Sequence, residues 1–456
     1  PSGCAQRRQS AIQRGASMSR TFCPLPWNFQ AIRANGDLRV CCQSNVTASR
    51  GVLKKSATES FNAGSDSLDD ARNSETLKDV RRSILKGEWN PNCTRCEQEE
   101  KAGLNSRRRY EGERWSLSLD DVRSFTDDTG HLDIDKQPIV YYDLRFGNLC
   151  NLKCRMCGPS DSSAWYDDWV SLMGRDSFKD THGLVKLEKS GDRFKTADYD
   201  WHYSETFWQQ LENKLDRVQY IYMAGGEPLL IKKHYDFLEK CVARNVARNI
   251  VLEYNTNCTQ LPEKVLNLWT QFKGVRVGAS IDGFGAVFEY QRFPAKWNQV
   301  YQNLQTLNGQ PENILSWMAF TVTAYNIFHM TDFMKWKLQD ERLKNINRTQ
   351  HRPIISPHVA HHPKFLNIRV LPPPLKERVE QNFREFCLWL RKEDFAPHIQ
   401  AQGDSIASSM ISYMREQDYH ESFWKEFCSY TFKLDQIRGQ NLLDICPEYE
   451  GFYQPA

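Results

Sequence analysis

From about residue 139 onward, short apolar runs rich in β-branched residues alternate with amphipathic stretches. Helical spacing of apolar residues predicts helices in the stretches between these runs, at 207–215, 232–242, 262–272, 297–307 and 328–338. Strands joined by such long connections pair in parallel through right-handed crossovers. The predicted strands are Ile139–Arg145, Val218–Met223, Ile250–Tyr254, Val275–Ile281, Ser316–Val322 and Asn367–Leu371. Six such units predict an α/β fold, either an open sheet or, as we expect, a partial (β/α)6 TIM-like barrel. In both cases the ligand site belongs at the carboxyl ends of the strands.

Two polar segments, 174–203 and 339–365, interrupt this alternation and are long enough to be functional loops or lids. After residue 374 the pattern becomes helical to about residue 434. The segment before the barrel differs: Phe29–Arg33 and Leu38–Cys41 flank an Asn-Gly-Asp turn and predict a hairpin. A helix is expected at Glu75–Lys86, with Gly87 just past its end. We therefore expect a leader or expression remnant at 1–17, a small cysteine-rich domain at 18–115, the barrel at 116–372 and a helical C-terminal extension at 373–456.

Length and charge restrict the class of protein. A chain of 456 residues is long enough for two or three domains, and its formal net charge of +3 is too small to predict a nucleic acid or an anionic membrane as partner. No apolar run approaches the ~20 residues that span a bilayer, and no signal peptide opens the sequence. These features favour a cytoplasmic protein.

The cysteines are the most informative residues. There are 14, and nine of them lie between Cys4 and Cys157, mostly at motif-like spacings, which favours metal ligation over disulfides. Cys150, Cys154 and Cys157 form a C-x3-C-x2-C motif directly after the first barrel strand. Three thiolates can hold three irons of a [4Fe-4S] cluster and leave the fourth iron open. Zinc is the alternative, because a C-x-x-C pair also fits a zinc knuckle, but a closed zinc site needs a fourth ligand.

Three motifs taken together resemble the radical S-adenosylmethionine (SAM) superfamily over about residues 139–372. They are the cysteine motif, Ala224-Gly-Gly-Glu-Pro228 after the second strand and Ser280-Ile-Asp-Gly283 after the fourth. The resemblance implies that Gly225, Gly226 and Glu227 bind the SAM amino group, that Ser280 and Asp282 bind its ribose or carboxylate, and that Arg292 pairs with its carboxylate. It further places Asn255 and Asn257 in the pocket, with Met156 where many members carry an aromatic residue against the adenine.

A second group of cysteines precedes the barrel. Cys23 and Cys41, with Gly36 between them, form C-x12-G-x4-C, and Cys93 and Cys96 follow. This resembles the opening half of a SPASM domain, in the abbreviated "twitch" form that binds one auxiliary [4Fe-4S] cluster, although such domains usually follow the barrel. A Cys4 zinc site is the competing interpretation. Cys42 could replace Cys41 as ligand, but the x4 spacing favours Cys41.

The resemblance implies an enzyme that cleaves SAM reductively and abstracts a substrate hydrogen with the 5′-deoxyadenosyl radical. Its cofactors would be SAM and two [4Fe-4S] clusters, and its electrons would come from a flavodoxin or a ferredoxin. We expect a peptide or protein substrate. The alternatives are dehydrogenation or epimerisation of a small molecule such as a sugar or aminocyclitol and, in another class, a non-catalytic iron–sulfur or zinc interaction protein.

Overall fold

The structure is a computed structural model that describes residues 21–44, 51–101, 105–180, 182–347 and 353–454, so the predicted leader lies outside it. The chain forms two compact units. The first comprises Pro1–Leu144 and Trp201–Ile221, and the second comprises Arg145–Asp200 and Tyr222–Ala456. The domain boundaries after residues 115 and 372 remain a prediction from the sequence.

An eight-stranded, mostly parallel sheet runs through the chain in the order β12-β11-β10-β9-β8-β3-β1-β2. Its strands are β1 (Phe29–Ile32), β2 (Leu38–Arg39), β3 (Tyr141–Phe146), β8 (Tyr220–Gly225), β9 (Val251–Thr256), β10 (Gly274–Ser280), β11 (Ile314–Val322) and β12 (Ser356–Val359). The sequence-predicted strands before residue 323 therefore form, each within a few residues of its expected bounds. The sheet is open, with β12 and β2 at its edges.

The sixth predicted strand, Asn367–Leu371, is wrong. Those residues form a 3₁₀ turn, Ile368–Val370, in which the Asn367 side chain accepts a hydrogen bond from the Arg369 amide at 3.0 Å. An asparagine that bonds its own backbone in this way competes with strand pairing. The strand that pairs with β11 is instead β12, in register from Ala319 opposite Ser356, inside the segment predicted as a loop.

The first unit contains the predicted hairpin. β1 and β2 pair antiparallel with Ala31 opposite Arg39, which confirms the prediction. β1 also pairs in parallel with β3, Phe29 opposite Tyr141. The helices of this unit are α2 (Leu25–Asn28), α3 (Leu68–Arg72), α4 (Glu75–Leu85), α5 (Thr94–Lys101), α6 (Arg107–Arg114), α7 (Leu119–Ser124) and α9 (Glu205–Glu212).

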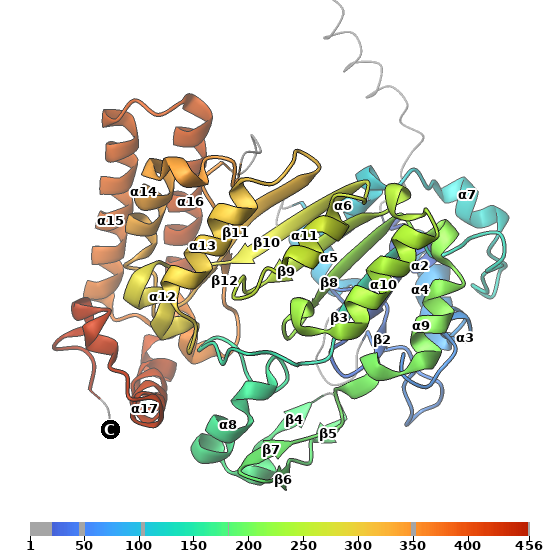
Figure 1. Cartoon of the computed structure of the whole chain (residues 1–456), viewed down its shortest axis with the longest axis horizontal. Helices are drawn as coiled ribbons and strands as arrows, with labels where there is room; N and C mark the ends of the chain where they lie inside the picture. The colour runs from blue at the N-terminus through green and yellow to red at the C-terminus, as the bar shows by residue number, and fades with distance from the viewer. Residues whose placement is uncertain (1–20, 45–50, 102–104, 181, 348–352, 455–456) are drawn as a thin grey trace, which may run out of the picture. The chain divides into compact units, whose positions relative to one another are not determined.

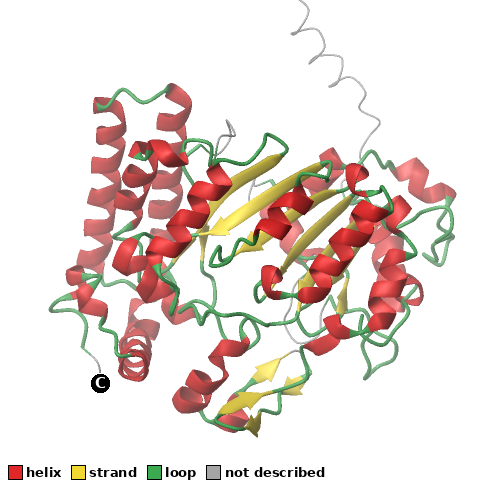
Figure 2. Ribbon diagram, viewed as in Figure 1, coloured by secondary structure: helices red, strands yellow, loops and turns green. Residues whose placement is uncertain are grey.

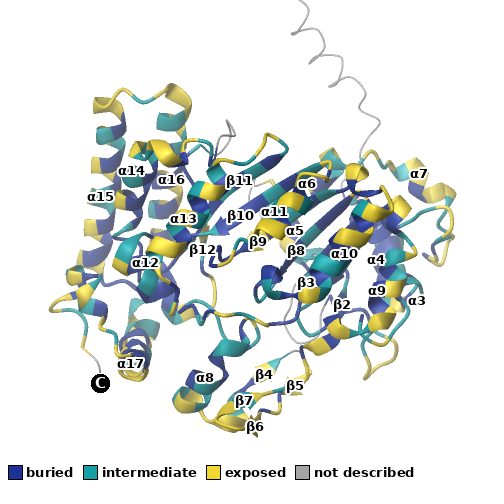
Figure 3. Ribbon diagram, in the orientation of Figure 1, coloured by how far each residue is buried: buried dark blue, intermediate teal, exposed yellow. Residues whose placement is uncertain are grey.

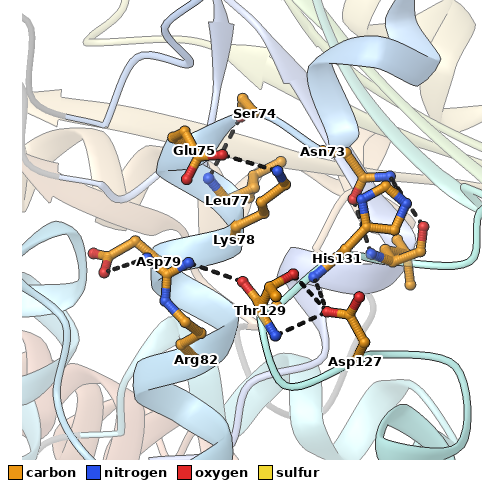
Figure 4. A network of polar contacts seen from close by, with 12 residues as sticks. Asn73, Ser74, Glu75, Leu77, Lys78, Asp79, Arg82, Asp127, Thr129 and His131 are labelled. Atoms are coloured by element: carbon orange, nitrogen blue, oxygen red, sulfur yellow. Dashed lines mark hydrogen bonds and ion pairs between the residues drawn. The ribbon is translucent and has the colours of Figure 1, made fainter.

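Helix α4 confirms the expected helix at Glu75–Lys86. The Ser74 side chain caps its first turn by accepting from the Leu77 amide, and Lys78 pairs with Glu75 at 2.8 Å (Figure 4). A turn at 127–131 lies against the helix, where Arg82 donates to the Thr129 carbonyl at 2.8 Å (Figure 4). Caps and contacts of this kind fix where the helix starts and which turn it contacts.

In the second unit, β9, β10, β11 and β12 are all parallel (Figures 1 and 2). Alternate residues of β11 are buried, because successive side chains of a strand point to opposite faces of the sheet (Figure 3). Helices α11 and α13 lie along one face of β9–β11 (Figure 1). The polar segment 174–203 forms two short hairpins, β4 (Lys179–Asp180) with β5 (Gly183–Leu184) and β6 (Glu188–Ser190) with β7 (Arg193–Lys195).

The helices of the second unit are α8 (Tyr166–Met173), α10 (Lys232–Ala243), α11 (Glu263–Trp269), α12 (Gly285–Gln291), α13 (Trp297–Asn308), α14 (Met330–Gln339), α15 (Pro373–Lys392), α16 (Pro397–Glu416) and α17 (His420–Arg438). The last three form the predicted helical C-terminal region, in which α15 and α16 lie side by side (Figure 1). Within the described ranges, none of the helices combines the length and the apolar character needed to cross a membrane.

Arg81 on α4 holds the first unit together through backbone carbonyls. Its fully buried guanidinium donates to the carbonyls of Pro26 at 3.1 Å and Gly130 at 3.0 Å, and also to that of Arg72. Burial lowers the pKa of Arg81 to about 9. One side chain therefore satisfies acceptors from three separate segments.

We expect Arg81→Leu to lower the free energy of unfolding by about 3 kcal/mol or more, because each buried carbonyl left without a donor costs about 1–3 kcal/mol. Urea denaturation measures the change. The matched control is Arg82→Leu on the same helix, which removes only an exposed hydrogen bond to the Thr129 carbonyl and a partly exposed ion pair with Asp79 that contributes less than about 1 kcal/mol. Equal losses for the two variants would contradict the role given to Arg81.

Candidate functional site

The candidate site is built where strands end. The three-cysteine motif follows β3, Glu227 follows β8, Asn257 follows β9 and Asp282 follows β10. Because parallel strands share the direction in which they end, the segments that follow them meet at one edge of a sheet. Cys150, Cys154, Cys157 and their partners described below all belong to the second unit.

Cys154 lies within interaction distance of each of the other two cysteines of the motif. The Cys157 amide donates to the Cys154 carbonyl at 3.0 Å, and the two thiols are hydrogen-bonded. That hydrogen bond lowers the pKa of Cys154, helped by the nearby Arg292 cation, and raises that of Cys157. Burial, with repulsion from Cys154, raises the pKa of Cys150 to about 12. Three cysteines on one loop, with Cys154 beside each of the other two, are the donor set that an open-iron [4Fe-4S] cluster requires.

Two of these sulfurs have a polar neighbour from elsewhere in the second unit, one just after β9 and one at the end of α12. Asn257 Nδ2 lies 3.7 Å from Cys150 Sγ, and Arg292 Nη1 lies 3.8 Å from Cys154 Sγ. The Leu152 amide also donates to Cys150 Sγ, at 3.4 Å. Donors around ligand sulfurs orient them and stabilise their negative charge. The loop therefore has the surroundings of a thiolate cluster site.

Glu227 holds the end of β9. It is 1% exposed, and its Oε1 accepts from Thr256 Oγ1 at 2.8 Å and the Leu229 amide at 3.1 Å. Its Oε2 accepts from the Asn257 amide at 2.7 Å. Burial raises the pKa of Glu227 to about 7, and these hydrogen bonds limit the rise. The carboxylate thereby fixes Asn257, the residue whose side chain approaches Cys150.

Asp282 plays the equivalent part for Arg292. Both are buried, and Asp282 Oδ2 lies 2.7 Å from Arg292 Nη2. Asp282 Oδ1 accepts from the Thr321 amide of β11 at 2.6 Å. Burial raises the pKa of Asp282, opposed by the Arg292 charge, and Asp282 in turn favours the charged form of Arg292. The ion pair holds the guanidinium beside Cys154.

The glycine that ends β8 and the one that follows it allow backbone segments to approach closely. A Cβ on Gly226 would lie 2.2 Å from the Leu149 carbonyl oxygen, and one on Gly225 would lie 2.8 Å from the Phe146 amide nitrogen. The Glu227 amide donates to that Leu149 carbonyl at 2.8 Å. Only glycine fits here, and the contact ties the end of β8 to the residue before Cys150.

The other sequence-predicted residues are less directly involved. Ser280 is the last residue of β10, and Met156 lies half-buried within the cysteine loop. Asn255 donates to the Tyr222 hydroxyl at 2.6 Å. The sequence analysis missed Thr256 and Arg155. Arg155 could have been found, because a charged residue between two predicted ligands indicates a role at the site.

The first unit holds the second group of cysteines. Cys23, Cys41, Cys93 and Cys96 line one small cavity together with Asn92, Trp89, Arg107 and Arg108. Burial raises the pKa of Cys23 and Cys93, and repulsion among the four thiols raises both further. Thiols that repel one another in this way are stabilised when a cation binds them. The donor set fits an auxiliary iron–sulfur cluster.

Cys42 has different surroundings from Cys41. Cys42 interacts electrostatically with Arg107, whose Nη2 donates to the Tyr141 hydroxyl at 2.9 Å and lies 2.6 Å from Glu111 Oε1. Of this adjacent pair, Cys41 lines the cavity.

Within the described residues, no three Cys, His, Asp or Glu side chains are grouped as the ligands of a single metal ion.

Comparison with known proteins gives one match by sequence family. Residues 23–97 match the model of the SPASM family, an iron-sulfur cluster-binding domain, and this range includes all four cysteines of the cavity. The segment is therefore similar to an iron–sulfur cluster-binding domain. Among curated proteins, none matches the sequence.

Several solved structures are distantly similar. Streptococcus suis SuiB bound to S-adenosylmethionine is 11% identical, over 70% of this chain and 63% of that chain, with a TM-score of 0.32. Streptococcus suis SuiB bound to precursor peptide SuiA is 11% identical over 69% of this chain and 63% of that chain, with a TM-score of 0.29. TYW1 with a lysine-pyruvate adduct is 10% identical over 56% of this chain and 73% of that chain, with a TM-score of 0.28. The chain thus spans about three fifths of the SuiB chains, and the likeness is too distant to assign a reaction.

We expect Gly226→Ala to destabilise the second unit by about 1–3 kcal/mol, because the added methyl meets backbone that cannot move without breaking the Glu227–Leu149 hydrogen bond. Urea denaturation followed by tryptophan fluorescence measures it. Gly158→Ala, in the cysteine loop, is the control, since a Cβ there meets open space. An unchanged Gly226→Ala variant would contradict the close approach.

Glu227 gives a pH dependence in the iron-free protein. Its pKa of about 7, against the usual 4.5, means that the folded chain binds more protons than the unfolded chain between those pH values. The free energy of unfolding therefore falls as pH rises from 4.5 to 7, by up to about 3 kcal/mol from this group. We expect Glu227→Gln to remove that fall, as measured by urea denaturation across this pH range. The exposed Glu263→Gln is the control, and parallel pH profiles for wild type and Glu227→Gln would contradict the assignment.

Proposed function

We propose that this chain, with its SPASM-like segment at 23–97, is a radical SAM enzyme that carries two [4Fe-4S] clusters. The observation that carries the proposal is the placement of Cys150, Cys154 and Cys157 on one loop after β3, with Asn257 Nδ2 and Arg292 Nη1 beside the sulfurs of Cys150 and Cys154. Cys150, Cys154 and Cys157 would hold the SAM-binding cluster, and Cys23, Cys41, Cys93 and Cys96 the auxiliary one.

Cys150, Cys154 and Cys157 would hold a cluster that, once reduced by one electron from the donor protein, would supply the reductive cleavage of SAM into methionine and a 5′-deoxyadenosyl group able to abstract a substrate hydrogen. The chain's own residues position the reactants and exclude water. Asn257 and Arg292 stabilise thiolate charge at Cys150 and Cys154, and the buried carboxylates of Glu227 and Asp282 keep those two donors in place. The cysteine loop is thereby held in one arrangement before the cosubstrate arrives.

The proposed SAM contacts follow the residues at the strand ends. We assign the amino group to the backbone at Gly225 and Gly226 and to Glu227, because a carboxylate oxygen has two lone pairs and Glu227 Oε2 accepts one bond from the chain. Arg292 and Asp282 would receive the carboxylate and ribose. We place Ser280, Asn255 and Met156 at the rim of the same pocket.

The auxiliary cluster would be fully ligated by four cysteines, which suits electron relay or structural support rather than substrate binding. We propose a peptide or protein as substrate, with a small molecule such as a sugar or aminocyclitol as the second candidate, because the SPASM-type radical SAM proteins that the chain resembles act on both classes. A flavodoxin or ferredoxin would supply the electron. A screen of candidate peptides for incorporation of solvent or substrate deuterium into 5′-deoxyadenosine would identify the substrate class.

The test of the enzyme is anaerobic reconstitution, followed by SAM and dithionite, with 5′-deoxyadenosine measured by mass spectrometry. We expect about eight irons per chain and formation of 5′-deoxyadenosine, because two cubane sites of four irons each are proposed. Cys150→Ala should abolish the product, and Cys93→Ala should lower bound iron to about four.

Cys387→Ala is the matched control, since this cysteine lies on α15 outside both groups, and it should retain the iron and the product of the wild type. Wild-type protein that binds about eight irons without forming 5′-deoxyadenosine would instead support a non-catalytic iron–sulfur protein.

A further inference from the structure

Arg155, between the second and third cysteines of the motif, is a buried cation whose partners come from the end of the C-terminal helix α17. It is 0% exposed, and its Nη2 donates to Asp435 and, at 2.9 Å, to Gln440 Oε1. Its guanidinium lies 3.6 Å from the Tyr290 ring centroid, and the Tyr290 hydroxyl donates to Asp435 at 2.9 Å. Arg155 is therefore enclosed on several sides at once.

A second anchor holds the neighbouring residues of the same loop. Asp168 accepts from Lys153 Nζ at 2.6 Å and from Arg438 Nε, on α17, at 2.9 Å. Arg438 also lies 4.5 Å from the Trp165 ring centroid, and Trp165 Nε1 donates to the Cys154 carbonyl at 2.9 Å. Three consecutive loop residues, 153 to 155, are thus held either by α17 or by residues that α17 contacts.

The sequence at the end of α17 explains how one helix reaches both anchors. Asp435 and Arg438 are three residues apart and so lie on the same face of the helix. Gly439 ends the helix in the left-handed conformation, with φ of 62°, and turns the chain so that Gln440 comes back to Arg155. The Leu442 amide then donates to Asp435 Oδ2 at 2.9 Å. Each residue type in Asp435-x-x-Arg438-Gly439-Gln440 is required by this geometry.

Buried ion pairs of this kind are poor sources of net stability, because desolvation offsets their attraction. They do fix geometry, since a planar guanidinium bonds in defined directions. A cluster held by three cysteines has one protein anchor fewer than a fully ligated one, so the rigidity of its loop matters more.

We propose that Asp435, Arg438 and Gln440 form a clamp that positions the three-cysteine loop for its open-iron cluster. They are positioning residues that act through Arg155 and Asp168. This inference rests on the proposed function only for the identity of the bound group.

The test uses the full chain, reconstituted anaerobically, and follows the release of iron to the chelator bathophenanthroline. In Asp435→Asn we expect iron to leave the three-cysteine site at least tenfold faster than in wild type, while the second site releases iron at the wild-type rate. A Cys150→Ala protein, which retains the second site, identifies that site's phase. Glu426→Gln, which neutralises an exposed carboxylate on the same helix, is the control and should release iron as the wild type does.

Gln440→Ala removes one neutral acceptor and leaves every charge paired, so it tests the clamp even if Asp435→Asn fails to fold. We expect the same selective acceleration, smaller in size, and a broadened electron paramagnetic resonance signal from the reduced three-cysteine site. Unchanged release in both variants, or equal acceleration at both sites, would overturn the clamp. These readouts do not require SAM cleavage. A wild-type protein that forms no 5′-deoxyadenosine would therefore contradict the proposed function without contradicting the clamp.

Discussion

The structure around the three-cysteine loop depends on charges that are buried and paired. Glu227 and Asp282 each lose their hydration where a strand ends, and each is compensated by donors from the neighbouring strand or helix. A buried carboxylate without such donors would cost several kcal/mol. The requirement to satisfy these two groups therefore fixes where Asn257 and Arg292 lie, and through them the surroundings of two cysteines.

The two cysteine groups differ in how negative charge on their sulfurs is compensated. Cys23, Cys41, Cys93 and Cys96 share one cavity in which burial and the neighbouring thiolate charges raise their pKa values, so a bound cation would offset the repulsion that deprotonation creates. In the other group, Arg292 already stabilises charge on Cys154. The surroundings of the four-cysteine group are thus set by its own cysteines. Those of the three-cysteine loop are set by the residues that contact its cysteines.

Much of the fold could be predicted because strand and helix periodicities are local. The hairpin at β1 and β2 and the helix α4 follow from turn and cap residues. The strand at Asn367–Leu371 was wrong because an apolar run does not reveal that Asn367 bonds its own backbone. The pairing of β1 with β3 was also missed, since register between segments more than 100 residues apart leaves no local pattern.

The same limit applies to the site. Motif spacing predicted the cysteines and Glu227. It could not predict the contact of Arg155 with Asp435, which lies 280 residues further along the chain.

The separation between Arg155 and Asp435 has a consequence for the order of events in the cell. A contact over so long a loop forms late, because loop-closure entropy must be overcome before the contact contributes. The ribosome makes the cysteine loop well before it makes Asp435, so the loop waits in a loosely held state. The final geometry of the loop is therefore set only after α17 has been synthesised and docked.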